Sequence, residues 1–133
     1  RYEVLAANPE EAKNTSGSDE ETVERSMTSG FNLPLTVKST ITYKSGLEHV
    51  ILLLSTPVDE TSSYFTFVIW RNDDFSIPAE EVISFDRAIG EEDRVMLEKL
   101  NGVMPLGKTA LVNVQSDKAT VEWRRQLLNL INE

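Results

Sequence analysis

The middle of the chain, residues 35–71, alternates apolar and polar positions in the way that β-strands do. Leu35–Tyr43 follows period two and is rich in β-branched residues, whereas Leu47–Ser55 is more uniformly apolar, which favours a central strand. Tyr64–Arg71 predicts a third strand. Short connections with turn residues separate these segments, so the sequence predicts consecutive antiparallel strands.

Weaker patterns precede these strands. Tyr2–Ala6 and Thr22–Thr28 favour two further strands. Between them, Asn8–Glu21 is polar and contains Pro, Gly and Ser, so we expect a long surface loop there. Ser29–Pro34 is expected to form a turn.

The apolar residues change to helical spacing in the second half of the chain. Val82–Ile89 fits one helical face, with Ser76 as a candidate N-cap, and Gly90 is expected to interrupt the helix. Glu91–Leu100 and Asp117–Ile131 predict two more helices. Strands followed by helices, without alternation between the two, indicate an α+β fold in which helices cover one face of an antiparallel sheet.

The composition is that of one soluble globular domain, with 133 residues, 40% of them hydrophobic and 26% charged. The net charge of −9 argues against nucleic acid and anionic membrane surfaces as partners, because both are negatively charged. No apolar run reaches the roughly 20 residues that a membrane helix needs.

The inventory of reactive side chains excludes several kinds of chemistry. The chain has no cysteine, which excludes disulfides, thiolate metal ligands and a cysteine nucleophile within it. It has one histidine, His49, which a Ser-His-Asp triad would have to use. The nucleophile-elbow, dinucleotide-binding and P-loop motifs are missing from the sequence.

Three segments carry a family resemblance. Ser55–Arg71 begins with STPVDETSSY and ends in WR, Phe85–Glu98 reads FDRAIGEEDRVMLE, and Ser116–Leu127 reads SDKATVEWRRQL. In this order and spacing they resemble the C-terminal part of the catalytic domain of Rieske-type non-haem iron oxygenases, in the vanillate-demethylase-like group.

The resemblance implies a helix-grip (START-like) fold, in which a curved antiparallel sheet grips a long helix over a substrate cavity. In that family two histidines and one aspartate hold a mononuclear Fe(II), and the aspartate of the motif falls on Asp93. The family's two histidines, and its cysteine–histidine motif for the [2Fe-2S] Rieske cluster, lie upstream of the matched segments. The resemblance therefore implies a partial domain that begins after both metal motifs and is inactive alone.

For the parent enzyme, the resemblance implies dioxygen-dependent hydroxylation or demethylation of an aromatic or other hydrophobic small molecule. A ferredoxin or reductase would donate electrons through the Rieske cluster. Homotrimers that use Rieske-domain contacts are common in the family. We therefore expect a cytoplasmic, homotrimeric parent and no stable trimer of this chain alone.

The residues themselves leave the ligand assignment open. Asp93 also fits a helix-start acid that the helix dipole stabilises, and Glu92 and Asp86 compete with it as ligands. His49 does not fit the family's ligand spacing, so we expect a partly exposed or hydrogen-bonded strand histidine. In the aromatic strand, Phe65 and Phe67 share one face.

These two phenylalanines and Met96 are candidate substrate-pocket residues, with plain core packing as the alternative. Arg124 and Arg125 are candidates for docking a redox partner, but a solvated helix face with acidic neighbours is the simpler interpretation. A second class of function also stays open, namely a non-catalytic helix-grip module that binds a hydrophobic ligand or a protein partner. The lack of two ligand histidines favours that module when the chain is taken by itself.

Overall fold

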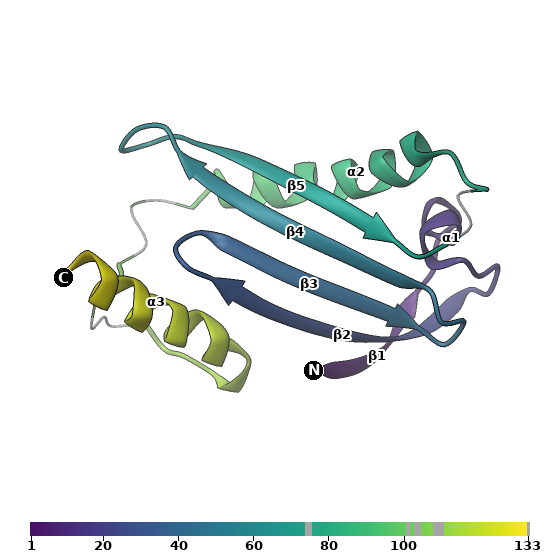
Figure 1. The fold of residues 1–133 in the computed structure, drawn as a ribbon, viewed down its shortest axis with the longest axis horizontal. Coiled ribbons are helices and arrows are strands. Elements are labelled where there is room, and N and C mark those ends of the chain that lie inside the picture. Colours follow the sequence, from purple (N-terminus) through teal and green to yellow (C-terminus); the bar gives the residue numbers. More distant parts are fainter. Residues whose placement is uncertain (74–75, 101, 103–104, 108–110, 133) are drawn as a thin grey trace.

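The computed structural model describes residues 1–73, 76–100, 102, 105–107 and 111–132. Its centre is an antiparallel sheet whose strands lie side by side in the same order as in the sequence (Figure 1). The strands are β1 (Tyr2–Ala7), β2 (Thr22–Asn32), β3 (Thr36–Tyr43), β4 (Glu48–Pro57) and β5 (Ser63–Arg71). The strands predicted from period-two patterns are therefore confirmed, and β2 extends into the segment expected to be a turn.

The helices gather behind the sheet and at its ends. They are α1 (Glu10–Ser16), α2 (Ala79–Leu97), the 3₁₀ turn η1 (Gln115–Asp117) and α3 (Lys118–Ile131). In Figure 1, α2 runs behind β4 and β5, α1 lies near the beginning of α2, and α3 stands beside the turn between β2 and β3. The α+β prediction is confirmed, and the arrangement is consistent with a helix-grip-like fold.

The strand register sorts the side chains into rows on each face of the sheet. The face that α2 covers carries the rows Met27–Ile41–His49–Arg71 and Phe31–Val37–Leu53–Phe67. Ile41 and His49 in the first row are buried, whereas the second row is only partly covered. The closed part of the core therefore lies at one end of this face, and an apolar row lies open towards the other end.

The opposite face of the sheet carries an apolar patch on β4 and β5. Its members are the exposed Tyr64, Val68 and Trp70 and the partly buried Val50, Leu52 and Leu54. This face is turned towards the viewer in Figure 1, and no described helix crosses it.

The polar segment between β1 and β2 contains a helix, so the loop expected over residues 8–21 is wrong. α1 begins after Pro9, with two glutamates at its positive end, and Gly17 ends it in the left-handed conformation with φ 67°. The last two residues of the helix are buried against the rest of the domain. Tertiary contacts outweigh the weak helix propensity of this Asn-, Thr- and Ser-containing segment.

The expected interruption at Gly90 is also wrong, because α2 is continuous from Ala79 to Leu97. Gly90 lies over β5, where a Cβ atom would stand 3.7 Å from the ring of Phe67. A separation of this size is an ordinary van der Waals contact, so the position has room for a methyl group.

Gly90→Ala is therefore expected to raise the free energy of unfolding by about 0.5–1 kcal/mol, because alanine loses less conformational entropy in a helix. Urea unfolding followed by circular dichroism measures the change. Gly46→Ala is the matched control. Its added Cβ would meet nothing within 4 Å, but its φ of 87° disfavours alanine, so this variant should lose stability. A loss of stability in Gly90→Ala would show that the helix cannot accept the methyl group.

Candidate functional site

Two contacts with the sheet define the inward stripe of α2. Asp86 Oδ2 lies 3.3 Å from Nε2 of His49 on β4, and Gly90 lies over Phe67 on β5. With 3.6 residues per turn, Asp93 falls on the same stripe, nearly one turn beyond Gly90. The helical rise places it about 4.5 Å further along the axis, towards the beginning of β5.

Asp93 is an exposed carboxylate without a hydrogen bond or ion pair to any other residue in the described part of the chain. Its neighbours are engaged elsewhere, since Arg94 pairs with both Glu91 and Glu98. These contacts lower the pKa of Glu91 and raise the pKa of Arg94. Asp93 therefore offers an unengaged anionic oxygen on the side of α2 that faces the sheet.

The two competing carboxylates have different surroundings. Asp86 is next to His49 and its side chain is 9% exposed, so it is not open to a ligand from solvent. Glu92 is exposed, and helical periodicity turns it well away from the stripe that Asp86 and Asp93 share. Among the three carboxylates, Asp93 has the position that suits a metal ligand at the sheet face.

An apolar hollow of about 430 Å³ lies where α3 meets the turn between β2 and β3. Its lining includes Ser29, Phe31 and Val37, together with Ser55 and Trp123. The indole of Trp123 donates a hydrogen bond from Nε1 to the carbonyl oxygen of Pro34 at 2.8 Å, which fixes this wall. Apolar walls with a few hydroxyl groups suit a small hydrophobic molecule.

The candidate pocket residues take different places. Phe67 is partly buried below Gly90, and Phe65 lies further along the same face with 54% of its surface exposed. Met96 is exposed and lies to the side of the inward stripe of α2. The structure thus brings Phe65, Phe67 and Asp93 to one face, with Met96 at its margin.

The sequence patterns did not single out Phe31 or Trp123 as lining residues. Phe31 falls in the segment expected to be a turn, but it belongs to β2 and faces the same side as Phe67. Trp123 flanks the apolar stripe of α3, and that flanking position was the one signal available for it. Only the placement of α3 beside the β2–β3 turn reveals that these two residues line one hollow.

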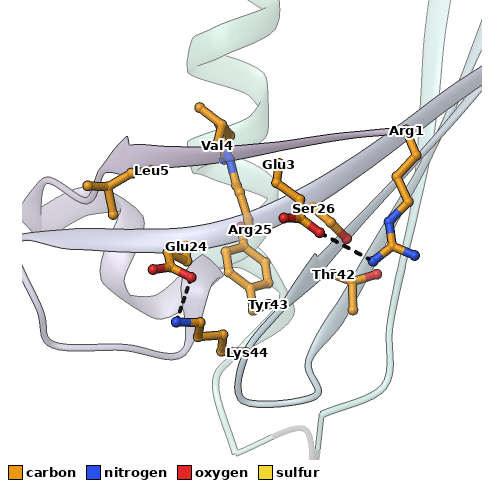
Figure 2. A pocket seen from close by; sticks show the side chains of 10 residues that line it. All are labelled: Arg1, Glu3, Val4, Leu5, Glu24, Arg25, Ser26, Thr42, Tyr43 and Lys44. Carbon is orange, nitrogen blue, oxygen red and sulfur yellow. Dashed lines mark ion pairs between the residues drawn. The ribbon is translucent and has the colours of Figure 1, made fainter.

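A second hollow, of about 570 Å³, lies over the ends of β1, β2 and β3 and is shown in Figure 2. Four of its five charged groups are paired within it, since Arg1 is 3.9 Å from Glu3 and Lys44 is 2.5 Å from Glu24, and Arg25 is the fifth. Opposite charges that compensate each other leave little net attraction for a charged ligand. None of the predicted site residues lines this hollow, and we assign no function to it.

The ring of His49 is 1% exposed and makes no hydrogen bond in the described part of the chain, so the expectation of a partly exposed or hydrogen-bonded histidine is wrong. The ring is enclosed between β4 and α2, where Nε2 and Asp86 Oδ2 are close enough for an ion pair. The two atoms are not aligned for a hydrogen bond, and neither ring nitrogen has another hydrogen-bonding partner in the described part of the chain. The strand histidine is thus a buried group with one acidic neighbour.

The two arginines of α3 differ in their surroundings. Arg124 is buried and donates a hydrogen bond to Oδ1 of Asn113 at 2.8 Å, so the expectation of a solvated side chain is wrong for it. Arg125 is exposed and pairs with Glu122, as expected, which lowers the pKa of Glu122 to about 2.

The polar residues of the Ser55–Arg71 segment shape the structure around the site. Asp59 accepts hydrogen bonds from the backbone N–H groups of Thr61 and Ser62, which lowers the pKa of Asp59 and closes the turn between β4 and β5. At the other end of β5, the side chain of Arg71 donates to two backbone carbonyls of α1. This segment therefore holds the sheet and α1 in place.

Within residues 1–73, 76–100, 102, 105–107 and 111–132, no three His, Cys, Asp or Glu side chains gather into a metal-binding group. Asp93 is a single carboxylate and does not make such a group by itself. None of the described helices has both the length and the apolar composition that crossing a membrane requires.

Comparison with protein families agrees with these features. The family model described as the vanillate O-demethylase oxygenase C-terminal domain matches residues 1–133. No curated protein and no solved structure matches the chain significantly. The family match spans the sheet, the α2 stripe with Asp93 and the hollow beside α3, and the chain therefore belongs to the vanillate O-demethylase oxygenase C-terminal domain family.

Proposed function

We propose that this domain supplies the carboxylate ligand and an apolar wall of the substrate site in a Rieske-type non-haem iron oxygenase. The observation that carries the proposal is the place of Asp93. It is an unengaged carboxylate on the inward stripe of α2, beyond the contact of Gly90 with Phe67, on a face with an open apolar row. Membership of the oxygenase-domain family supports the same reaction class.

The donor chemistry of the proposal is a facial triad of two imidazoles and one carboxylate, which leaves open positions on Fe(II). Asp93 is the carboxylate in this proposal. His49 is not one of the imidazoles, because it is buried beside Asp86. Both imidazoles then belong to a part of the oxygenase outside this chain, and the bound iron supplies the activation of dioxygen.

The proposed reaction class is demethylation or hydroxylation of a hydrophobic, aromatic small molecule. For an aryl methyl ether, one dioxygen, two electrons and two protons convert the ether to a phenol, formaldehyde and one water. The electrons come from a ferredoxin or reductase by way of a Rieske [2Fe-2S] cluster outside this chain. In this proposal the residues of the domain orient the aromatic ring against the apolar row and exclude water from it.

The hollow beside α3 suggests how the substrate would lie on the sheet in this proposal. Phe31 and Val37 in its wall belong to the same row as Leu53 and Phe67, which leads across the sheet towards α2. A flat apolar molecule lying on this row would have one end near α3 and the other near the α2 stripe. Phe65 lies beside that path on the same face.

The test uses the oxygenase subunit that carries this domain, supplied with Fe(II), a reduced electron donor and a panel of methoxybenzoates. Dioxygen uptake and formaldehyde release are measured together. Phe65→Ala is expected to raise KM about tenfold, because an aromatic contact contributes about 0.5–1.5 kcal/mol beyond its buried area. Tyr64→Ala is the matched control, since Tyr64 is the neighbouring exposed aromatic residue on the other face of the sheet.

Iron- and dioxygen-dependent formaldehyde release with a selective effect of Phe65→Ala supports the proposal. Tight binding of hydrophobic ligands without any dioxygen uptake would instead favour the non-catalytic binding module. If Tyr64→Ala raises KM as much as Phe65→Ala does, the proposed face of the sheet is not the one that binds the substrate.

A further inference from the structure

We propose that the buried His49–Asp86 pair is a positioning device for Asp93. The pair fixes the rotation and the axial position of α2 over the sheet, and thereby the place of the Asp93 carboxylate. This inference rests on the proposed function, because it assigns the pair to the geometry of the same metal site.

The first observation is that the pair joins two different elements inside the core. His49 on β4 is 1% exposed and the side chain of Asp86 on α2 is 9% exposed, with Nε2 and Oδ2 3.3 Å apart. Separating two buried polar groups is costly, because each is left without its partner in a medium of low polarity. A slide or rotation of α2 therefore carries a penalty at this point.

The second observation is that the other contacts of α2 are few and lie in its first half, where Ile83 and Phe85 are partly buried and Glu81 accepts a hydrogen bond from Asn14 of α1. Val82 is the one buried apolar side chain of the helix, while Ile89, Val95 and Leu97 remain substantially exposed. Apolar packing is also tolerant of small rotations, since it is not directional. The buried pair is thus the polar contact that opposes displacement of α2 from the sheet near its middle.

The other charged side chain in the same row is already engaged. Arg71 is the neighbour of His49 on β5, but its guanidinium donates to backbone carbonyls of α1 and pairs with Asp73. It is therefore not the partner that holds Asp86. In the described part of the chain, Asp86 has His49 as its ion-pair partner.

The third observation is the spacing between the pair and the candidate ligand. Asp93 follows Asp86 by about two helical turns, so both carboxylates lie on one stripe, about 10 Å apart along the axis. A rotation of α2 that moves Asp86 away from His49 turns Asp93 by the same angle. Metal sites respond strongly to such changes, and loss of groups that orient a ligand typically costs about 10–100-fold in affinity or activity.

The test compares four variants of the oxygenase subunit that carries this domain. His49→Leu leaves Asp86 buried without a partner, and the double variant His49→Leu/Asp86→Leu replaces the pair by apolar groups. His49→Gln keeps a side-chain N–H that can reach Asp86. Asn8→Ala is the control for stability, because buried Asn8 donates to the carbonyls of Ser18 and Glu20 and takes no part in the His49–Asp86 pair.

Two quantities are measured for each variant: the melting temperature, and the Fe(II) affinity from anaerobic equilibrium titration. His49→Leu should lose both thermal stability and iron affinity. The double variant should recover most of the thermal stability, because apolar replacement of a buried pair is often tolerated, and still bind Fe(II) at least about tenfold more weakly. His49→Gln should bind iron nearly as the parent does, and Asn8→Ala should melt earlier with its iron affinity unchanged.

The positioning role is overturned if the double variant binds iron as tightly as the parent. It is also overturned if iron affinity simply follows melting temperature across all variants, including Asn8→Ala. Asp93→Ala is titrated alongside as the separate check on the proposed function. If Asp93→Ala keeps its iron, the assignment of Asp93 as a ligand is refuted. If Asp93→Ala loses its iron but the His49 and Asp86 variants keep the iron affinity of the parent, only the role of the pair is refuted.

Discussion

Asp93→Ala is expected to strip the mononuclear iron from the oxygenase subunit that carries this domain and to reduce its turnover to background. The carboxylate is exposed on the inward stripe of α2 and has no other partner among the described residues, so its removal takes away an anionic ligand without breaking a structural contact. Losing groups outside the coordination shell already costs about 10–100-fold, and losing a ligand should cost more than about 100-fold in Fe(II) affinity. Iron content after desalting and formaldehyde release measure the two effects.

Glu92→Ala is the matched control, because it removes the same charge one position earlier on a different side of the helix. It should keep its iron and its turnover. The visible absorption of the Rieske cluster should be unchanged in both variants, since that cluster belongs to another part of the proposed enzyme. Full iron occupancy in Asp93→Ala, or equal losses in the two variants, would refute the assignment of Asp93.

Arg71→Met is expected to destabilise the domain strongly, because the Arg71 side chain joins β5 to α1 in a largely buried place. The Arg71 side chain is 7% exposed and pairs with Asp73, and its Nη1 donates to the carbonyl oxygens of Asn14 and Thr15. Methionine keeps much of the bulk but leaves these acceptors without a donor in a largely buried place. Breaking a buried charged pair costs about 3–5 kcal/mol, although the 20% exposure of Asp73 favours the lower end of that range.

A loss of this size is a large part of the roughly 5–15 kcal/mol by which a domain is stable. Urea unfolding and the melting temperature of the variant measure it. Arg125→Met is the control, because Arg125 is an exposed arginine whose pair with Glu122 lies on the surface of α3, and such solvent-screened pairs contribute little to stability. Equal effects of the two substitutions would mean that Arg71 does not anchor α1 to β5.

The strands were predictable because they follow from local pattern alone. Period-two alternation in Thr36–Tyr43 and Ser63–Arg71, with a more apolar β4 between them, reflects a sheet with one face against a helix. α1 was not predictable in the same way, because its sequence resembles a loop and contacts with the rest of the fold stabilise the helix. The continuity of α2 through Gly90 likewise depends on packing against the sheet, which the sequence does not display.

The residues of the candidate site also differ in whether the sequence alone could reveal them. Asp93 was found through the resemblance of its segment, and helical periodicity from Asp86 and Gly90 then places it towards the sheet. The burial of His49 beside Asp86 depends on which strand lies under which turn of α2, and neither residue has a local signal for that pairing. The hollow beside α3 was missed for the same reason, because Trp123 and Pro34 meet across a separation of 89 residues.

The order of strands in the sheet also bears on how the chain folds. Each strand pairs with its neighbour in the sequence, so most of the sheet forms from hairpins that close short loops. Such local topology favours rapid folding, whereas the helices meet their partners across long stretches of chain: Asn14 and Glu81 are 67 residues apart, and Trp123 and Pro34 are 89 residues apart. Closing a loop of that length costs more chain entropy than closing a hairpin, so we expect the Trp123 wall of the apolar hollow to form late in folding.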